Sequence, residues 1–234
     1  MRRTTLGAFA AIALVAGAAA FVSLPGFATA QGGGTIEADV KYNGASVVET
    51  IKVNKDTEAC GKEAKIEKVV VGSNKGLANA VVSVAGAKGQ ATAKKATVDQ
   101  KGCKFVPHVV AMMPGEIDIL NSDGILHNLH TYSTANPAIN KAQPKFKKTM
   151  TEKFDKPEFI KITCDVHSWM LGWVAVMPHP FFGVTGDTGT TKIENVPPGK
   201  HTVEVWHETL GKQTKDVEVK AGQTAKVSFE MKGK

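Results

Sequence analysis

Three side chains with soft donor atoms lie within the seven-residue stretch CDVHSWM, residues 164–170. Cys164 offers a thiolate, His167 an imidazole and Met170 a thioether. A mononuclear redox copper site uses one thiolate, two imidazoles and commonly a weak axial thioether. The stretch therefore supplies three of these four donors, and the second imidazole must come from elsewhere in the chain.

The stretch NSDGILHNLH is the best source of the second imidazole, because it follows the strand-like sequence EIDIL. His127 and His130 have opposite parity on an extended segment, so only one of them would face a site on one side. Both can ligate if the chain turns at Asn128. For His108 and His179 a structural or gating role fits better than ligation.

The chain contains three cysteines, an odd number. Cys60, in EACGK, and Cys103, in KGCKF, lie in polar, turn-like contexts that suit a surface disulfide. Cys164 ends the alternating stretch EFIKITC, in which Ile160 and Ile162 share its face of a strand. We therefore predict a Cys60–Cys103 disulfide and a free, inward-facing Cys164.

Residues 1–30 have the pattern of a signal peptide: Arg2 and Arg3, an apolar stretch, and the small residues ATA ending at Ala30. Cleavage would make the protein periplasmic or secreted, and retention as a membrane anchor is the alternative. The formal net charge of +7 favours acidic partners or an anionic surface. Lysines are scattered rather than grouped, so no nucleic-acid partner is expected.

Short apolar stretches separated by Gly, Pro or Asn predict an all-β protein of β-sandwich type. Examples are GTIEADVKYNG, LANAVVSVAGA, GEIDILNSDG, EFIKITC, GWVAVMP, HTVEVWHE and AKVSFEMK. The stretch TANPAINKAQPKFKKTM lacks strand character and predicts a long loop with a short helical turn.

Two stretches resemble the ligand pattern of plastocyanin-like cupredoxins. KGCKFVPHVVAMMPGEIDILNSDGILHN is similar to its first half and FIKITCDVHSWMLGWVAV to its second. The resemblance implies a Greek-key β-sandwich that binds one copper ion through His127, Cys164, His167 and Met170. It also implies that Asn128 holds the ligand loops together by hydrogen bonds.

The loop departs from the family in the spacing between His167 and Met170, which is two residues instead of the usual four. The shorter spacing resembles the dinuclear copper centre of cytochrome oxidase. That centre needs a second cysteine in the loop, where this chain has Asp165 and Val166. A dinuclear centre is therefore excluded, while a three-coordinate or open site without Met170 remains an alternative.

The rest of the chain resembles the carboxypeptidase regulatory-like, or transthyretin-like, β-sandwich. The similarity lies in FGVTGDTGTTKIENVPPGKHTVEVWHETLG and in the first two strand-like stretches. It implies a discontinuous domain of residues 35–90 and 181–234 around a copper domain of residues 91–180. Two sandwiches packed in tandem are the alternative.

The leading hypothesis is an exported one-electron carrier with a single copper ion and no catalytic residues. Its partners would be redox proteins, acidic or membrane-bound, with no small-molecule substrate. The alternatives are a copper trafficking or storage module, a copper redox enzyme with an open coordination position, a zinc or vestigial site, and an adhesion-type sandwich without metal. The pattern of a hydrolase or a nucleotide-binding loop is missing from the sequence.

Overall fold

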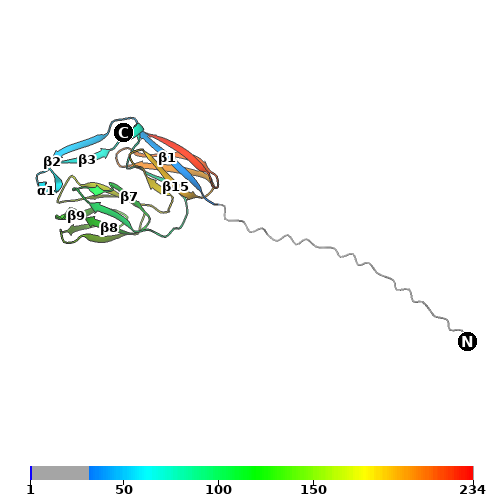
Figure 1. The fold of residues 1–234 in the computed structure, drawn as a ribbon, viewed down its shortest axis with the longest axis horizontal. Coiled ribbons are helices and arrows are strands. Elements are labelled where there is room, and N and C mark those ends of the chain that lie inside the picture. Colours follow the sequence, from blue (N-terminus) through cyan, green and yellow to red (C-terminus); the bar gives the residue numbers. More distant parts are fainter. Residues whose placement is uncertain (2–31, 234) are drawn as a thin grey trace. The chain divides into compact units, whose positions relative to one another are not determined.

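The computed structural model describes Met1 and residues 32–233, and this part is almost entirely β, which confirms the predicted class (Figure 1). Except for Met1, the predicted signal peptide of residues 1–30 lies outside the described residues. No helix in the described part is long and apolar enough to span a membrane. The helices are α1 Thr57–Cys60 and the short 3-10 helix η1 Ser73–Lys75, and the strands are β1 Gly34–Tyr42, β2 Val47–Lys52, β3 Glu63–Val69, β4 Val81–Val84, β5 Ala96–Gln100, β6 Phe105–Val106, β7 Val109–Met112, β8 Gly115–Asn121, β9 His127–Tyr132, β10 Asn140–Gln143, β11 Thr149–Phe154, β12 Glu158–Thr163, β13 Leu171–Val176, β14 Phe182–Val184, β15 Thr190–Val196, β16 Gly199–His207, β17 Gly211–Val219 and β18 Thr224–Met231.

One hydrophobic core is built from strands near the two ends of the described chain. Its two sheets have the strand orders β15-β1-β18 and β14-β4-β16-β17. In β1, Ile36, Ala38 and Val40 are fully buried, while the residues between them are partly exposed. This alternation is the two-residue period of a strand with one face on a core. Strand β1 pairs antiparallel with β15 and parallel with β18, so it lies in the middle of its sheet.

A second core is built from the middle of the chain, and its sheets have the orders β10-β9-β12-β13-β7 and β11-β8-β5-β6. In β12, Ile160 and Ile162 are buried, and Cys164 directly after the strand is 1% exposed. The predicted inward direction of Cys164 is therefore confirmed. Strand β12 lies between β9 and β13 in the sheet, so the ends of all three strands are neighbours.

The segment predicted as one long loop contains strand β10, which pairs antiparallel with β9, and the start of β11, so that prediction was wrong. Strand β10 is the edge of its sheet, and Asn140, Lys141 and Ala142 are all exposed. The one buried residue of this strand is the polar Gln143, so the strand has no alternating apolar residues. The missing alternation is why the sequence did not reveal it.

The hairpin of β2 and β3, with α1 between the strands, contributes to the second core. Val53 and Ala64 are buried there, and Ile51, Cys60 and Ile66 pack against the same cluster. The hairpin belongs in sequence to the segment 35–90, which was assigned to the other sandwich. The described residues 32–233 belong to one compact unit, and the domain boundaries stay a prediction.

Aromatic and polar contacts join the strands of the two cores. The ring centroids of Phe159 and Trp206 are 4.3 Å apart, and those of Trp173 and Trp206 are 5.1 Å apart. The indole of Trp173 donates a hydrogen bond to Glu208, which also pairs with His108. His108 thus takes part in a polar contact beside these strands, and the structural or gating role expected for it stays a prediction.

The carboxylate of Glu158, at the start of β12, holds the turn that follows β9. It accepts hydrogen bonds from the backbone N–H groups of Thr134 at 2.6 Å, Ala135 at 3.1 Å and Asn136 at 3.2 Å. The Ser133 hydroxyl donates a further hydrogen bond to the same carboxylate. Burial by itself raises the pKa of the Glu158 carboxyl, but these hydrogen bonds outweigh it and hold the pKa well below its ordinary value.

Replacement of Glu158 by glutamine should destabilise the fold in a pH-dependent manner. Because folding depresses this pKa, the carboxylate contributes stability that is complete above the unfolded-state pKa of about 4.3 and is lost as the pH falls further. We expect Glu158→Gln to lower the free energy of unfolding by about 2 kcal/mol at pH 7 and by less at pH 3. Urea denaturation at both pH values measures this, with the exposed Glu63→Gln as control. An equal loss at both pH values would contradict the assignment.

Candidate metal centre

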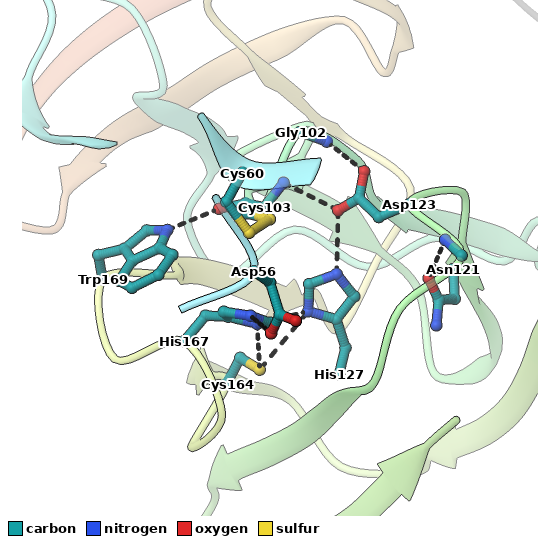
Figure 2. The surroundings of a disulfide bond; sticks show 11 residues. Asp56, Cys60, Gly102, Cys103, Asn121, Asp123, His127, Cys164, His167 and Trp169 are labelled. Atoms are coloured by element: carbon teal, nitrogen blue, oxygen red, sulfur yellow. Dashed lines mark hydrogen bonds and ion pairs between the residues drawn. A yellow bond between two sulfur atoms is a disulfide. The ribbon is translucent and has the colours of Figure 1, made fainter. Parts of the chain in front are cut away.

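The ends of three strands bring His127, Cys164 and His167 together (Figure 2). His127 begins β9, and Cys164 directly follows β12, the strand with which β9 pairs. His167 lies in the turn between β12 and β13, which is closed by a 2.9 Å hydrogen bond from the Met170 N–H to the His167 carbonyl. The sheet register therefore fixes the relative position of the three side chains.

The three donor atoms form a small, closed triangle. The Nδ1 atoms of His127 and His167 are 3.0 Å apart, and the Cys164 Sγ lies 3.7 Å from the first and 3.8 Å from the second. Both imidazoles are 0% exposed and the thiol is 1% exposed. A point equally distant from the corners of such a triangle lies about 2 Å from each, close to the bond lengths of about 2.0 Å and 2.3 Å that metals make to imidazole and thiolate.

A carboxylate binds the outer nitrogen of each imidazole. His127 Nε2 lies 2.9 Å from Asp123 Oδ2, and His167 Nε2 lies 3.0 Å from Asp56 Oδ2. An ionised carboxylate only accepts hydrogen bonds, so each Nε2 must carry the hydrogen. In the neutral imidazoles both Nδ1 lone pairs then face each other across 3.0 Å, which is repulsive unless a cation lies between them. One thiolate with two imidazoles is a donor set that suits copper.

These two carboxylates were not predicted from the sequence. Asp123 precedes His127 by four residues in the same loop, and this short spacing is a signal that could have been used. Asp56 is separated from His167 by 111 residues, and no local pattern connects them. Carboxylates that fix the orientation of metal-binding imidazoles are a recurrent feature of metal sites.

Asn128 connects the two loops that carry the donor atoms. Its backbone N–H points at the Cys164 Sγ at 3.4 Å. Its side-chain Oδ1 accepts the N–H of Asp165 at 2.6 Å and that of Val166 at 3.3 Å, and its Nδ2 donates to Asn140 Oδ1 at 2.8 Å. These contacts join the two loops, and the role of Asn128 in holding metal ligands stays a prediction.

Burial favours the neutral forms of the Cys164 thiol and the His127 imidazole in the metal-free protein. It raises the pKa of Cys164, although N–H groups of Asn128, His167 and Val166 partly oppose the shift. Burial also lowers the pKa of His127, against the opposing effect of the hydrogen bond to Asp123. A bound cation would offset the penalty on the Cys164 thiolate, and His127 is already held in the neutral form that can bind a metal.

His130, the competitor of His127, does not take part in the triangle. Its Nδ1 lies 2.9 Å from Asp165 Oδ1, and its side chain is 30% exposed. Its ring stacks on that of Tyr132 with the centroids 4.6 Å apart. His127 and His130 thus point in opposite directions, as expected for two residues an odd number of positions apart on an extended strand.

Met170 is 1% exposed and belongs to the same hydrophobic cluster as Cys164 and Trp169. Its position is fixed by the turn hydrogen bond to the His167 carbonyl. A thioether in this cluster fits core packing as well as ligation, so the axial role of Met170 stays a prediction.

The predicted disulfide between Cys60 and Cys103 is confirmed, with the Cα atoms 5.2 Å apart, and Cys164 is free. The disulfide lies next to the triangle (Figure 2). The two sulfurs and a ring nitrogen of His167 all lie within 4.8 Å of one another.

Comparisons with known proteins give partial likenesses to copper proteins. No family model and no curated protein matches the chain. Among solved structures, a copper-containing nitrite reductase from Thermus scotoductus SA-01 matches with 24% identity and a TM-score of 0.32 over 41% of this chain. The match spans only 25% of the reductase chain. A purple cupredoxin from Nitrosopumilus maritimus matches over 36% of this chain and 100% of its own, with 18% identity and a TM-score of 0.31.

An oxidised amicyanin variant matches over 41% of this chain and 98% of its own, with 17% identity and a TM-score of 0.32. These likenesses cover less than half of the chain.

Loss of the Asn128 side chain should loosen the donor triangle. Asn128→Ala removes the acceptor of two loop N–H groups, and we expect metal affinity to fall about 10- to 100-fold. Competition with a chelator measures the affinity. The control is Asn140→Ala, which removes the partner of Nδ2 but leaves the Oδ1 contacts intact. Equal affinities of the two variants would contradict the role of Asn128.

Proposed function

We propose that the chain is an exported copper protein that carries single electrons. The observation that carries the proposal is the buried triangle of two imidazole Nδ1 atoms and one Sγ, with sides of 3.0, 3.7 and 3.8 Å. His127, His167 and Cys164 would hold the ion, and copper bound there would supply a one-electron couple. Two imidazoles and a thiolate are compatible with both oxidation states of copper.

Copper is favoured over zinc by the number of donors. Structural zinc is almost always bound by four protein ligands in a tetrahedral arrangement. The triangle provides only three donor atoms, two imidazole nitrogens and one sulfur. Trigonal coordination by two histidines and a cysteine, with a weak fourth ligand, is typical of electron-transfer copper sites.

Burial favours an electron carrier over an enzyme with an open coordination position. Both imidazoles are 0% exposed and Cys164 is 1% exposed, so a substrate has no direct access to the donors. Electrons can still pass through the surrounding protein. The hydrogen bonds of Asp56, Asp123 and Asn128 hold the donors in place, which limits rearrangement when the charge changes.

The methionines give no specific support to copper storage. Met112 and Met150 are buried in the same hydrophobic cluster as Met170, and Met177 is buried in the cluster between the cores. Burial among apolar side chains fits packing for Met112, Met150 and Met177, whereas a storage module would need thioethers grouped around further ions.

Export to the periplasm or the exterior is part of the proposal and is supported by the signal-peptide pattern and by the disulfide, which suits an oxidising compartment. The formal charge of +7 supports acidic or membrane-bound redox partners. The sandwich that resembles carboxypeptidase regulatory-like domains would serve as a rigid support or docking module.

Removal of the thiol should abolish the spectrum of the copper form. We expect wild-type protein loaded with Cu(II) to show an intense visible band from charge transfer between thiolate and copper. Cys164→Ser should lose the band and the associated electron paramagnetic resonance signal. The control is the exposed Ser73→Ala, which lies far from the donors in sequence. Persistence of the band in Cys164→Ser would reject the proposed donor set.

Replacement of Met170 tests the fourth ligand. A thioether favours Cu(I), so its loss should shift the equilibrium toward Cu(II). We expect Met170→Gln to lower the reduction potential, measured by redox titration, and to leave stoichiometric copper binding intact. Met150→Gln places the same amide in the same cluster and serves as control. A wild-type potential in Met170→Gln would make Met170 a packing residue and the site three-coordinate.

A further inference from the structure

The β2–β3 hairpin carries a short segment, residues 53–62, that we name the cover segment; Figure 2 shows its Asp56 and Cys60 beside the donor triangle. Val53 at one end is 8% exposed and packs in the core that contains Cys164. The Val53 N–H donates to the Lys62 carbonyl at 3.0 Å, which closes the segment into a loop. The cover segment is therefore anchored at its base, and its tip is α1.

Asp56 occupies the N-cap position of α1 but makes no side-chain capping bond. An aspartate in this position normally accepts an N–H of the first helical turn. Here its Oδ2 binds His167 Nε2 at 3.0 Å instead. Its backbone is left-handed, with φ 50° and ψ 40°, a conformation that is costly for most residues and more accessible to aspartate. The local preference of the residue is thus overridden in favour of the contact with His167.

The disulfide fixes the tip of the cover segment to the turn between β5 and β6, which is hydrogen-bonded to Asp123, the partner of the other imidazole. Cys60 ends α1 and is bonded to Cys103. The N–H of Cys103 donates to Asp123 Oδ2 at 2.8 Å, and the same oxygen binds His127 Nε2 at 2.9 Å. The segment that carries Asp56 is therefore linked to Asp123 through one disulfide and one hydrogen bond.

This arrangement has two physical consequences for His167. The acceptor on Nε2 keeps the hydrogen there, so the Nδ1 lone pair is available on the side of Cys164. The cover segment also keeps solvent from the ring, which is 0% exposed although Asp56 itself is 33% exposed. A negative charge at this distance stabilises the more oxidised state of any redox ion held by His167.

We propose that the cover segment is a structural component of the metal centre. Asp56 is the positioning residue for His167, and the Cys60–Cys103 disulfide keeps the cover segment in place. This inference rests on the proposed metal-binding function and adds a component supplied by a distant part of the chain. We therefore expect the metal affinity of the site, the reduction potential of the bound ion and its accessibility to chelators to depend on Asp56 and the disulfide, although neither binds the ion.

The experiment compares Asp56→Ala with Glu58→Ala in the full chain. Glu58 is an acidic residue on the same helix and lines the same surface hollow as Asp56. We expect Asp56→Ala to lower the affinity for copper and for zinc about 10- to 100-fold, to raise the reduction potential of the copper form, and to retain a wild-type thermal transition. Asp56→Asn, which keeps a neutral acceptor, should recover part of the affinity but not the potential. Glu58→Ala should behave as wild type.

A second variant tests the disulfide. Cys60→Ala combined with Cys103→Ala should release bound copper to a small chelator faster than Asp56→Ala does, because the whole segment is freed. Circular dichroism checks that this variant is folded. A release rate equal to wild type in the folded variant would overturn the role given to the disulfide.

The outcomes separate the inference from the proposed function. Suppose that the wild-type protein shows the copper band and that Asp56→Ala and Glu58→Ala have equal metal affinities and reduction potentials. This result would overturn the role of Asp56 but would not contradict the proposed electron-carrier function. A wild type that binds zinc but gives no copper–thiolate band would reject the electron carrier, while the zinc affinities of the same variants still decide the role of Asp56.

Discussion

The 3.0 Å approach of two buried imidazole nitrogens beside a thiol is the constraint around which the middle of the molecule is organised. Buried polar groups are costly unless each has a partner. The inner nitrogens face each other, so the outer ones take Asp123 and Asp56. The thiol receives an N–H from Asn128. Asp123 and Asn128 flank His127 in sequence, whereas Asp56 comes from a segment 111 residues away from His167. The geometry is thus supported from several sides at once.

Much of this centre could be predicted because its signals are local. Strand parity placed Cys164 inward and separated His127 from His130, and polar, Gly-containing surroundings identified the two disulfide cysteines. The all-β class followed from the many short apolar stretches. In each case a few neighbouring residues contain the physical cause, namely the two-residue period of a strand or the chemistry of a turn.

The features that could not be predicted depend on contacts between distant segments. Asp56 reaches His167 across 111 residues of sequence, and nothing in the polar stretch NKDTEAC distinguishes it from a solvent-exposed turn. Strand β10 is stabilised by pairing with β9, so its own polar sequence carries no sign of it. Most of the β2–β3 hairpin packs on a core other than that of its sequence neighbour β1, although Val69 at the end of β3 packs on the core of β1. These features depend on tertiary packing, which outweighs the local secondary-structure propensity of the sequence.

The origin of the cover segment limits how far the molecule can be divided into modules. Residues 91–180 contain all four predicted ligands, yet that stretch alone would leave the Nε2 of His167 without its acceptor and Cys103 without its bonded partner. The centre is therefore complete only when the N-terminal hairpin is present. Exchange or excision of residues 91–180 during evolution or engineering would therefore have to carry the hairpin along.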